Sequence, residues 1–155
     1  MRMQEQVNFI MAQYAMMSHS DFIKQVCGDI LGEGSYRDVY AMKDFPKLVI
    51  KIERSMDEAN FANVTEFRNY INNRFWLALK DWLAPCWGIT SDGVMMIQRR
   101  VTFRDPKHYP ALIPSVFTDT KYSNYGWIGK KFVACDYSFL THSSFRMKKV
   151  VWKNC

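Results

Sequence analysis

The chain has 155 residues, 48% of them hydrophobic and 15% aromatic, a composition that excludes a disordered protein and favours one globular domain over residues 1–155. Its net charge of +6 is uneven, because residues 1–96 hold ten Lys and Arg against twelve Asp and Glu, whereas residues 97–155 hold eleven against three. No run of about 18 apolar residues exists to span a membrane, and the polar N-terminus does not resemble a secretory signal, so we expect a cytoplasmic protein with reduced cysteines.

Residues 1–26 are predicted to form an N-terminal helical extension of one or two helices. Apolar residues recur near helical spacing there, and Ser20-Asp21 is a candidate cap for a second helix. From residue 27 the pattern changes, and Ile30–Ala41 is typical of two strands joined by a glycine-containing turn. Leu48–Ile52 is an apolar run typical of a buried strand, interrupted by Lys51. We expect Lys51 either to have an acidic partner or to lie on an edge strand with its ammonium group in solvent.

A helix is predicted over residues 57–82, where large apolar side chains recur every three or four positions. Glu66 adjoins this apolar stripe and is the candidate partner of Lys51. Glu58, which lies among polar residues where the helix would begin, is the alternative. After the helix, residues 87–98 are predicted to form a hairpin, since Ser91-Asp-Gly93 carries the Asp-Gly signal of a two-residue loop.

Polar residues are concentrated in the segment that follows. Asp119 and Asn124 stand in the pattern D-x-K-x-x-N, with Lys121 between them. Gly126 is expected in a turn, and a strand-like run over residues 132–135 ends at a further acid, Asp136. Asp and Asn often mark simple polar turns, so this pattern gains weight only from the motifs that precede it.

In their order along the chain, these motifs resemble those of the protein-kinase family. Gly32, Gly34 and Val39 are in register with its glycine-rich loop, and Arg37 replaces the third glycine. Arg37 would either stiffen this loop or place a cation near the phosphates. The run that contains Lys51 resembles the strand whose lysine pairs with the nucleotide phosphates.

The segments D-T-K-Y-S-N and D-Y-S resemble the kinase catalytic loop and the metal-binding D-F-G segment. The resemblance implies that Asp119 is the catalytic base and that Lys121 lies beside the transferred phosphoryl group. It implies that Asn124 and Asp136 hold Mg²⁺ through their oxygens, and that Gln98 lies where the backbone binds the adenine of ATP.

The resemblance covers residues 28–138 and implies an α+β fold with a kinase-like N-lobe sheet and helix, residues 27–139 forming the core. The chain departs from the family where His-Arg would precede Asp119 and where Tyr137-Ser138 replaces Phe-Gly. The helical substrate lobe is largely missing, and residues 140–155 are predicted to be a basic strand or tail. A kinase this compact would fit an economical genome, such as that of a virus.

Three functions from different classes follow. The retained charged residues favour an ATP/Mg²⁺-dependent phosphotransferase that acts on protein hydroxyls or on itself. The alternative is a kinase-like pseudoenzyme that binds and inhibits a partner protein, and in both cases the basic half would dock an acidic partner. The third is a nucleic-acid-binding domain with stacking platforms at Trp127, Trp152, Tyr122 and Tyr125. Nucleic acid is the least favoured partner, because the basic residues form no recognised binding motif.

Overall fold

A computed structural model of the protein describes residues 1–54, 61–73, 77–141 and 146–154. The protein belongs to the α+β class, as the sequence predicts, and it divides into two compact units. Unit 1 comprises Met1–Val64 and Pro85–Arg100, and unit 2 comprises Thr65–Ala84 and Val101–Cys155. In the described part of the chain no helix has the length and apolar character needed to cross a membrane. That the chain is a single domain stays a prediction.

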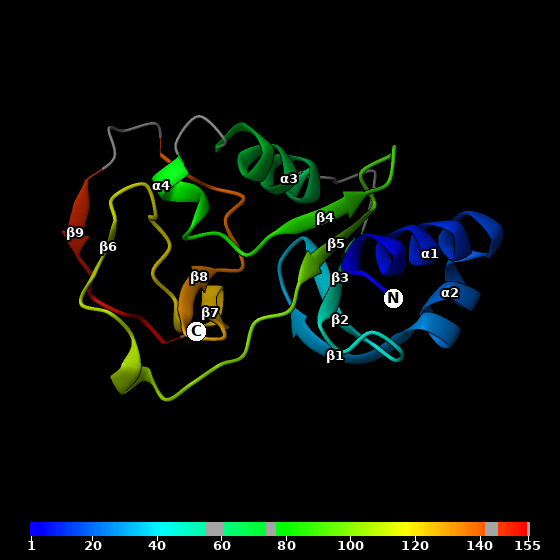
Figure 1. The fold of residues 1–155 in the computed structure, drawn as a ribbon, viewed down its shortest axis with the longest axis horizontal. Helices are drawn as coiled ribbons and strands as arrows, with labels where there is room; N and C mark the ends of the chain where they lie inside the picture. Colours follow the sequence, from blue (N-terminus) through cyan, green and yellow to red (C-terminus); the bar gives the residue numbers. More distant parts are fainter. Residues whose placement is uncertain (55–60, 74–76, 142–145, 155) are drawn as a thin grey trace. The chain divides into compact units, whose positions relative to one another are not determined.

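Unit 1 is built on a five-stranded antiparallel sheet in the order β1-β2-β3-β5-β4 (Figure 1). The strands are β1 Cys27–Glu33, β2 Arg37–Met42, β3 Leu48–Glu53, β4 Cys86–Ile89 and β5 Met95–Arg99. Strand β3 lies at the centre, and all six of its residues are buried. Lys51 is only 3% exposed. The alternative that Lys51 lies on an edge strand and points to solvent is therefore wrong.

Two helices, α1 Met3–Met16 and α2 His19–Val26, lie on the same side of this sheet (Figure 1). The core between helices and sheet contains alternate residues of the strands, including Ile50 of β3 and Ile97 of β5, packed with Ile10 and Phe22 of the helices. This alternation assigns the remaining residues of β3 and β5 to the opposite face of the sheet.

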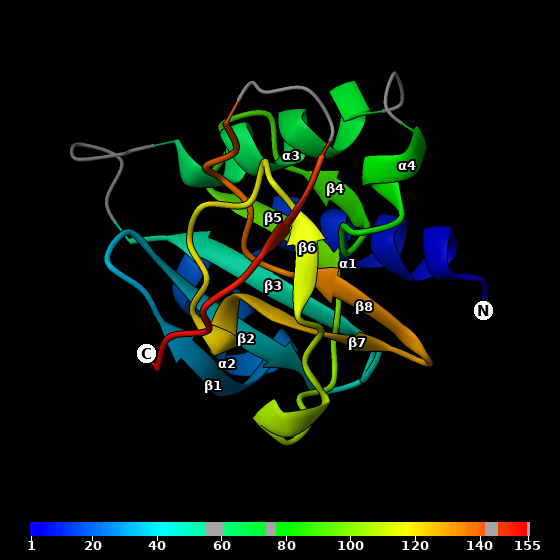
Figure 2. The ribbon, with the colours of Figure 1, turned by 90° about the vertical axis from the view of Figure 1, so that its left-hand side faces the viewer.

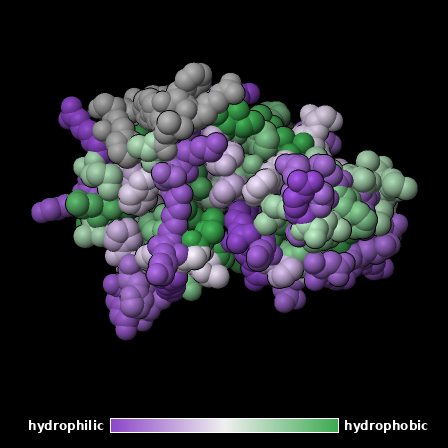
Figure 3. All heavy atoms as spheres, in the orientation of Figure 1, coloured by the Kyte–Doolittle hydropathy of each residue, from purple (hydrophilic) through white to green (hydrophobic). Residues whose placement is uncertain are grey.

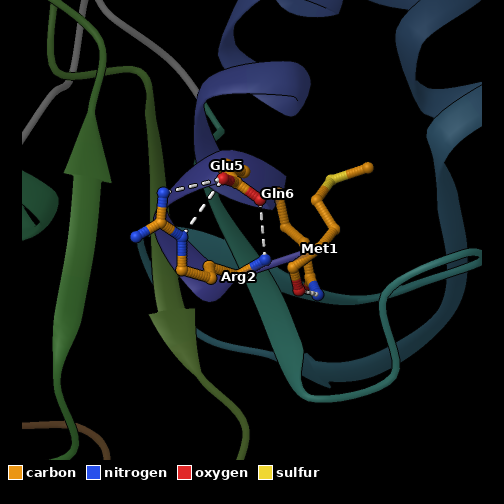
Figure 4. Close-up of polar contacts among 4 residues, drawn as sticks. All are labelled: Met1, Arg2, Glu5 and Gln6. Atoms are coloured by element: carbon orange, nitrogen blue, oxygen red, sulfur yellow. Dashed lines mark hydrogen bonds and ion pairs between the residues drawn. The ribbon is translucent and has the colours of Figure 1, made fainter.

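The starts of both helices have identifiable caps. At α1, the Arg2 backbone N–H and its Nε donate to the Glu5 carboxylate at 2.8 and 3.2 Å (Figure 4). These hydrogen bonds lower the pKa of Glu5. At α2, Ser18 Oγ accepts from the Asp21 N–H at 3.1 Å. The predicted cap at Ser20-Asp21 is wrong by two positions, because the hydroxyl of Ser18 reaches the third residue of the helix.

The predicted hairpin is present as β4 and β5, but its loop is longer than the Asp-Gly signal indicates. The Thr90 N–H donates to Met95 O at 2.9 Å, so residues 91–94 form the loop. Gly93 has φ +76° there, the left-handed conformation that glycine adopts without strain. A two-residue loop is therefore wrong, although the glycine does make the turn.

Helix α3 Ala62–Asn72 spans the boundary between the units, and α4 Leu77–Lys80 belongs to unit 2. They account for the described part of the predicted helix; Glu58 lies outside the described residues. The other elements of unit 2 are the short 3-10 helices η2 Pro106–His108 and η3 Tyr122–Asn124, with strands β6 Leu112–Pro114, β7 Tyr125–Ile128, β8 Lys131–Ala134 and β9 Met147–Lys149. Strand β9 pairs with β6 (Figure 2), so residues 147–149 are a strand, as predicted for the basic C-terminal segment.

The sequence predicts Gly126 in a turn, and this prediction is wrong. Gly126 lies inside β7. A Cβ at this position would lie 2.5 Å from Val101 Cγ2, so the glycine is required by the close approach of the chain at Val101 and Thr102. The turn between β7 and β8 instead uses Gly129, with φ +60°. Gly126 is thus required by close packing, and Gly129 by its backbone conformation.

Candidate functional site

The nucleotide-binding residues predicted in unit 1 share one face of its sheet. Strand register places Gly32 opposite Val39, Val39 opposite Lys51, and Lys51 opposite Met96, which makes a row across four strands. Gln98 lies two positions beyond Met96 on β5 and therefore on the same face, where it is fully buried. This face is the one that α1 and α2 do not cover.

The glycine-containing turn is closed by its own backbone. The Gly34 N–H donates to Arg37 O at 3.0 Å, and a Cβ on Gly34 would lie 3.1 Å from that oxygen. Gly34 is thus explained by the tightness of the turn. A Cβ on Gly32 would meet nothing within 4 Å.

Arg37 is held at the base of this turn by a residue that the sequence analysis missed. Its guanidinium donates to Asn63 Oδ1 at 2.9 Å, and both residues are buried. Asn63 Nδ2 in turn donates to the backbone oxygens of Lys51, Gly93 and Val94 at 3.0–3.1 Å. Of the two roles left open for Arg37, this contact favours stiffening of the loop. A buried amide at the start of a helix gives no motif, so the sequence offered no signal for it.

In unit 2 the four predicted polar residues of the catalytic and metal-binding segments come together. Lys121 Nζ lies 3.8 Å from Asp119 Oδ2, and Asn124 Nδ2 donates to Asp119 O at 3.4 Å. The Asp136 N–H donates to Asn124 O at 3.3 Å, which joins the two segments. Asn124 is 8% exposed, whereas Asp119, Lys121 and Asp136 are exposed. A buried amide therefore stands between exposed charged groups.

Tyr125 lies beneath these charges. Its hydroxyl donates to Asp119 O at 3.0 Å. Burial raises the pKa of Tyr125 strongly, and the negative charges of Asp119 and Asp136 add to the shift. The phenol therefore stays protonated and acts as a donor that fixes the backbone at Asp119.

The D-Y-S segment is fastened to α3 within unit 2. The Tyr137 N–H donates to Glu66 Oε1 at 3.3 Å, and Asn69 Nδ2 donates to the carbonyls of Tyr137 and Ser138 at 2.9 and 3.1 Å. The Tyr137 hydroxyl donates to Ala84 O at 2.6 Å. Glu66 thus has a described role in positioning the residue after Asp136. Its predicted ion pair with Lys51 joins residues of different units and stays a prediction.

Unit 2 offers the type of ligand atom that a hard divalent cation prefers, which is oxygen. No group of three or more His, Cys, Asp or Glu side chains is placed to hold a metal in the described part of the chain. Asn124 and Asp136, however, supply an amide oxygen and a carboxylate, which are ligands that Mg²⁺ accepts together with water and phosphate oxygens. Because Asn124 Nδ2 is used in its bond to Asp119 O, the amide oxygen is the part of this side chain left for a ligand role.

Of the aromatic residues proposed as nucleic-acid stacking platforms, Trp152 packs on Tyr122 and Tyr125, whereas Trp127 packs on Phe132. Tyr125 is 2% exposed, and Trp152 stacks on Tyr122 with ring centroids 5.8 Å apart. Arg104 lies over the ring of Trp127, 4.3 Å from its centroid. The prediction of a stacking platform is wrong for Tyr125, because a buried ring offers no face to a base.

No family model matches the chain, and no curated protein matches its sequence.

Proposed function

We propose that the protein is an ATP/Mg²⁺-dependent phosphotransferase that acts on hydroxyl groups of proteins. The observation that carries the proposal is the group formed by Asp119, Lys121, Asn124 and Asp136, which hydrogen bonds and an ion pair join within unit 2. Phosphoryl transfer requires such a set, because it depends on positioning and charge stabilisation more than on covalent catalysis. The row formed by Gly32, Val39 and Lys51 supports nucleotide binding.

Asp119 is the proposed base. Its exposed carboxylate accepts the proton of the acceptor hydroxyl while that oxygen forms a bond to the γ-phosphorus of ATP. The bond from the γ-phosphorus to the bridging oxygen breaks, and ADP leaves with the electron pair. Lys121 stabilises the negative charge on the transferred group. Mg²⁺ held by Asn124 and Asp136 would supply further neutralisation of the phosphates. The hydroxyl of Tyr125 keeps the backbone of Asp119 in place.

The test is incubation of the protein with γ-labelled ATP and Mg²⁺, alone and with cell extract. We expect Asp119→Asn to keep the fold and the ATP affinity and to reduce transfer about 10²-fold or more, since general-base catalysis contributes roughly 10²–10⁴-fold. Asp136→Asn should lose Mg²⁺-dependent ATP binding as well, because its role begins before the transfer step. Calorimetry with Mg²⁺ and with chelator measures the binding.

The contrast between the two variants is the control, because misfolding of a variant would remove its ATP binding together with its label transfer. Equal ATP binding with and without chelator would contradict the assignment of Asn124 and Asp136. If the wild type and Asp119→Asn are equally silent in labelling but both capture a partner protein, the phosphotransferase proposal fails. The protein would then be a kinase-like binding module.

A further inference from the structure

The C-terminal segment runs beside the segment that carries Asp119. The Lys153 N–H donates to Thr120 O, and the Tyr122 N–H donates to Lys153 O, both at 3.0 Å. These bonds flank Lys121 and make Lys121 and Lys153 partners in a parallel β-bridge. Figure 2 shows the C-terminal segment, in red, reaching the chain near η3. Paired residues of neighbouring strands project to the same face about 4.8 Å apart, so two lysines stand side by side.

The position of Lys153 is fixed by its neighbours in the sequence. Trp152 Nε1 donates to Pro110 O at 2.9 Å, and its ring packs on Tyr122 and edge-on to Tyr125. Thr120 Oγ1 donates to Val151 O at 3.0 Å. Contacts of the two residues that precede it therefore hold Lys153 in register with Lys121.

Around the bridge, the positive charges of Lys121 and Lys153 outnumber the negative charge of Asp119. Asp119 is the carboxylate beside Lys121, at 3.8 Å, and both side chains are 51% exposed. Lys153 is also exposed, and no ion pair involves it within the described residues. Lys121 and Lys153 carry like charges at paired positions of the bridge, and an anion with several oxygens would relieve the repulsion between them.

We propose that Lys121 and Lys153 form a binding site for a phosphate group, which makes Lys153 a further binding residue; the inference rests on the proposed phosphotransferase function. The ligand class is a multiply charged phosphate. It comes either from the terminal phosphate of the nucleotide or from a phosphate already carried by the acceptor.

The test uses the full chain without metal and titrates it with inorganic tripolyphosphate at about 0.1 M salt by calorimetry. Lys153→Glu should weaken binding about tenfold or more, because it removes one attraction and adds one repulsion. Lys149→Glu is the matched control, since it changes the net charge equally. Lys149 lies four residues from Lys153, about 13 Å along an extended chain and beyond the screening length of about 10 Å. We expect Lys149→Glu to weaken binding by less than about threefold.

Lys153→Gln keeps the inference testable if charge reversal disturbs the fold, and it should weaken binding about threefold. Equal affinities of the Lys153→Glu and Lys149→Glu proteins, or no binding of tripolyphosphate to the wild type, would overturn the inference. These results are independent of catalysis. If Asp119→Asn loses labelling but Lys153→Glu binds the anion as the wild type does, only the proposed lysine site is contradicted. If anion binding depends on Lys153 but the protein transfers no label, only the proposed phosphotransferase function is contradicted.

A parallel titration with O-phosphoserine separates the two sources of the phosphate. If the site binds the nucleotide, Lys153→Glu weakens the binding of tripolyphosphate, and phosphoserine does not bind to the wild type. If the site serves a phosphorylated acceptor, phosphoserine binds and the substitution weakens that binding by a similar factor. Either pattern supports a phosphate site at Lys121 and Lys153.

Discussion

The structure gives a local reason for the hydroxyl of Tyr137, a position for which the resemblance to kinases implies phenylalanine. The side chain is 1% exposed, and its hydroxyl donates to Ala84 O at 2.6 Å. A buried carbonyl that loses its donor retains a desolvation cost. The tyrosine at this position is thus explained by packing in unit 2.

We expect Tyr137→Phe to lower the free energy of unfolding by about 1–2 kcal/mol, because Ala84 O would lose the hydroxyl donor. Urea unfolding measures the change. Tyr36→Phe is the control, since Tyr36 is 47% exposed. Equal stabilities of the two variants would show that the hydrogen bond to Ala84 contributes nothing net.

Asn63 is the residue on which the polar contacts of unit 1 converge. Besides its side-chain bonds, its backbone N–H donates to Glu53 Oε1 at 2.8 Å. Asn63→Ala would leave Arg37 and three backbone carbonyls without this partner, so we expect a loss of about 2–4 kcal/mol. Asn72→Ala, at the exposed end of α3, should change stability by less than about 0.5 kcal/mol. A small effect of Asn63→Ala in urea unfolding would mean that water replaces the amide.

At the scale of elements, the hairpin of β4 and β5 depends on one aspartate in its loop. Asp92 Oδ1 accepts from Thr90 Oγ1 at 2.6 Å and from the Val94 N–H at 3.0 Å. These hydrogen bonds lower the pKa of Asp92. A carboxylate with a lower pKa in the folded protein stabilises it above the unfolded pKa, and this contribution is lost as the pH falls through the folded pKa.

We therefore expect the stability advantage of the wild type over Asp92→Asn to be present at pH 7 and to shrink below about pH 4, the ordinary range of an aspartate. Urea unfolding of both proteins at pH 7, 5 and 3 measures it. A difference that stays constant over this range would show that the carboxylate charge has no part in closing the loop.

For the whole molecule, the charge asymmetry follows the two units. Unit 1 holds nine Lys and Arg against ten Asp and Glu, whereas unit 2 holds twelve against five. Hydrophilic residues gather over the projecting segment that carries η2 (Figure 3), where residues 102–108 are exposed. We therefore propose unit 2 as the part of the chain on which an acidic partner docks.

We expect the protein to bind poly-L-glutamate, and its affinity to fall about tenfold between 50 and 300 mM salt as the surface charges are screened. Fluorescence anisotropy of the labelled polymer measures this, with poly-L-lysine as the control that should not bind. Binding that is insensitive to salt would point to apolar contacts, such as the methionines of α1.

The sequence predicted those parts of the fold that local patterns determine. The apolar run of β3, the helical N-terminus and the β4–β5 hairpin follow from periodicities and turn residues within about ten positions. The sequence also singled out the polar residues of unit 2 that contacts join, because Asp119, Lys121 and Asn124 lie within six positions of one another. Their approach to Asp136 required only the short hairpin of β7 and β8.

Other features were decided by contacts between distant parts of the chain. Asn63 joins residues up to 31 positions away, Asn69 reaches Ser138 across 69 positions, and Gly126 is required by the approach of Val101. Lys153 stands beside Lys121 because Trp152 and Val151 anchor the C-terminal segment there. Local sequence patterns record which element forms, since backbone propensity and period act over a few residues. They do not record which elements meet, because that depends on how side chains far apart in the sequence fill a shared core.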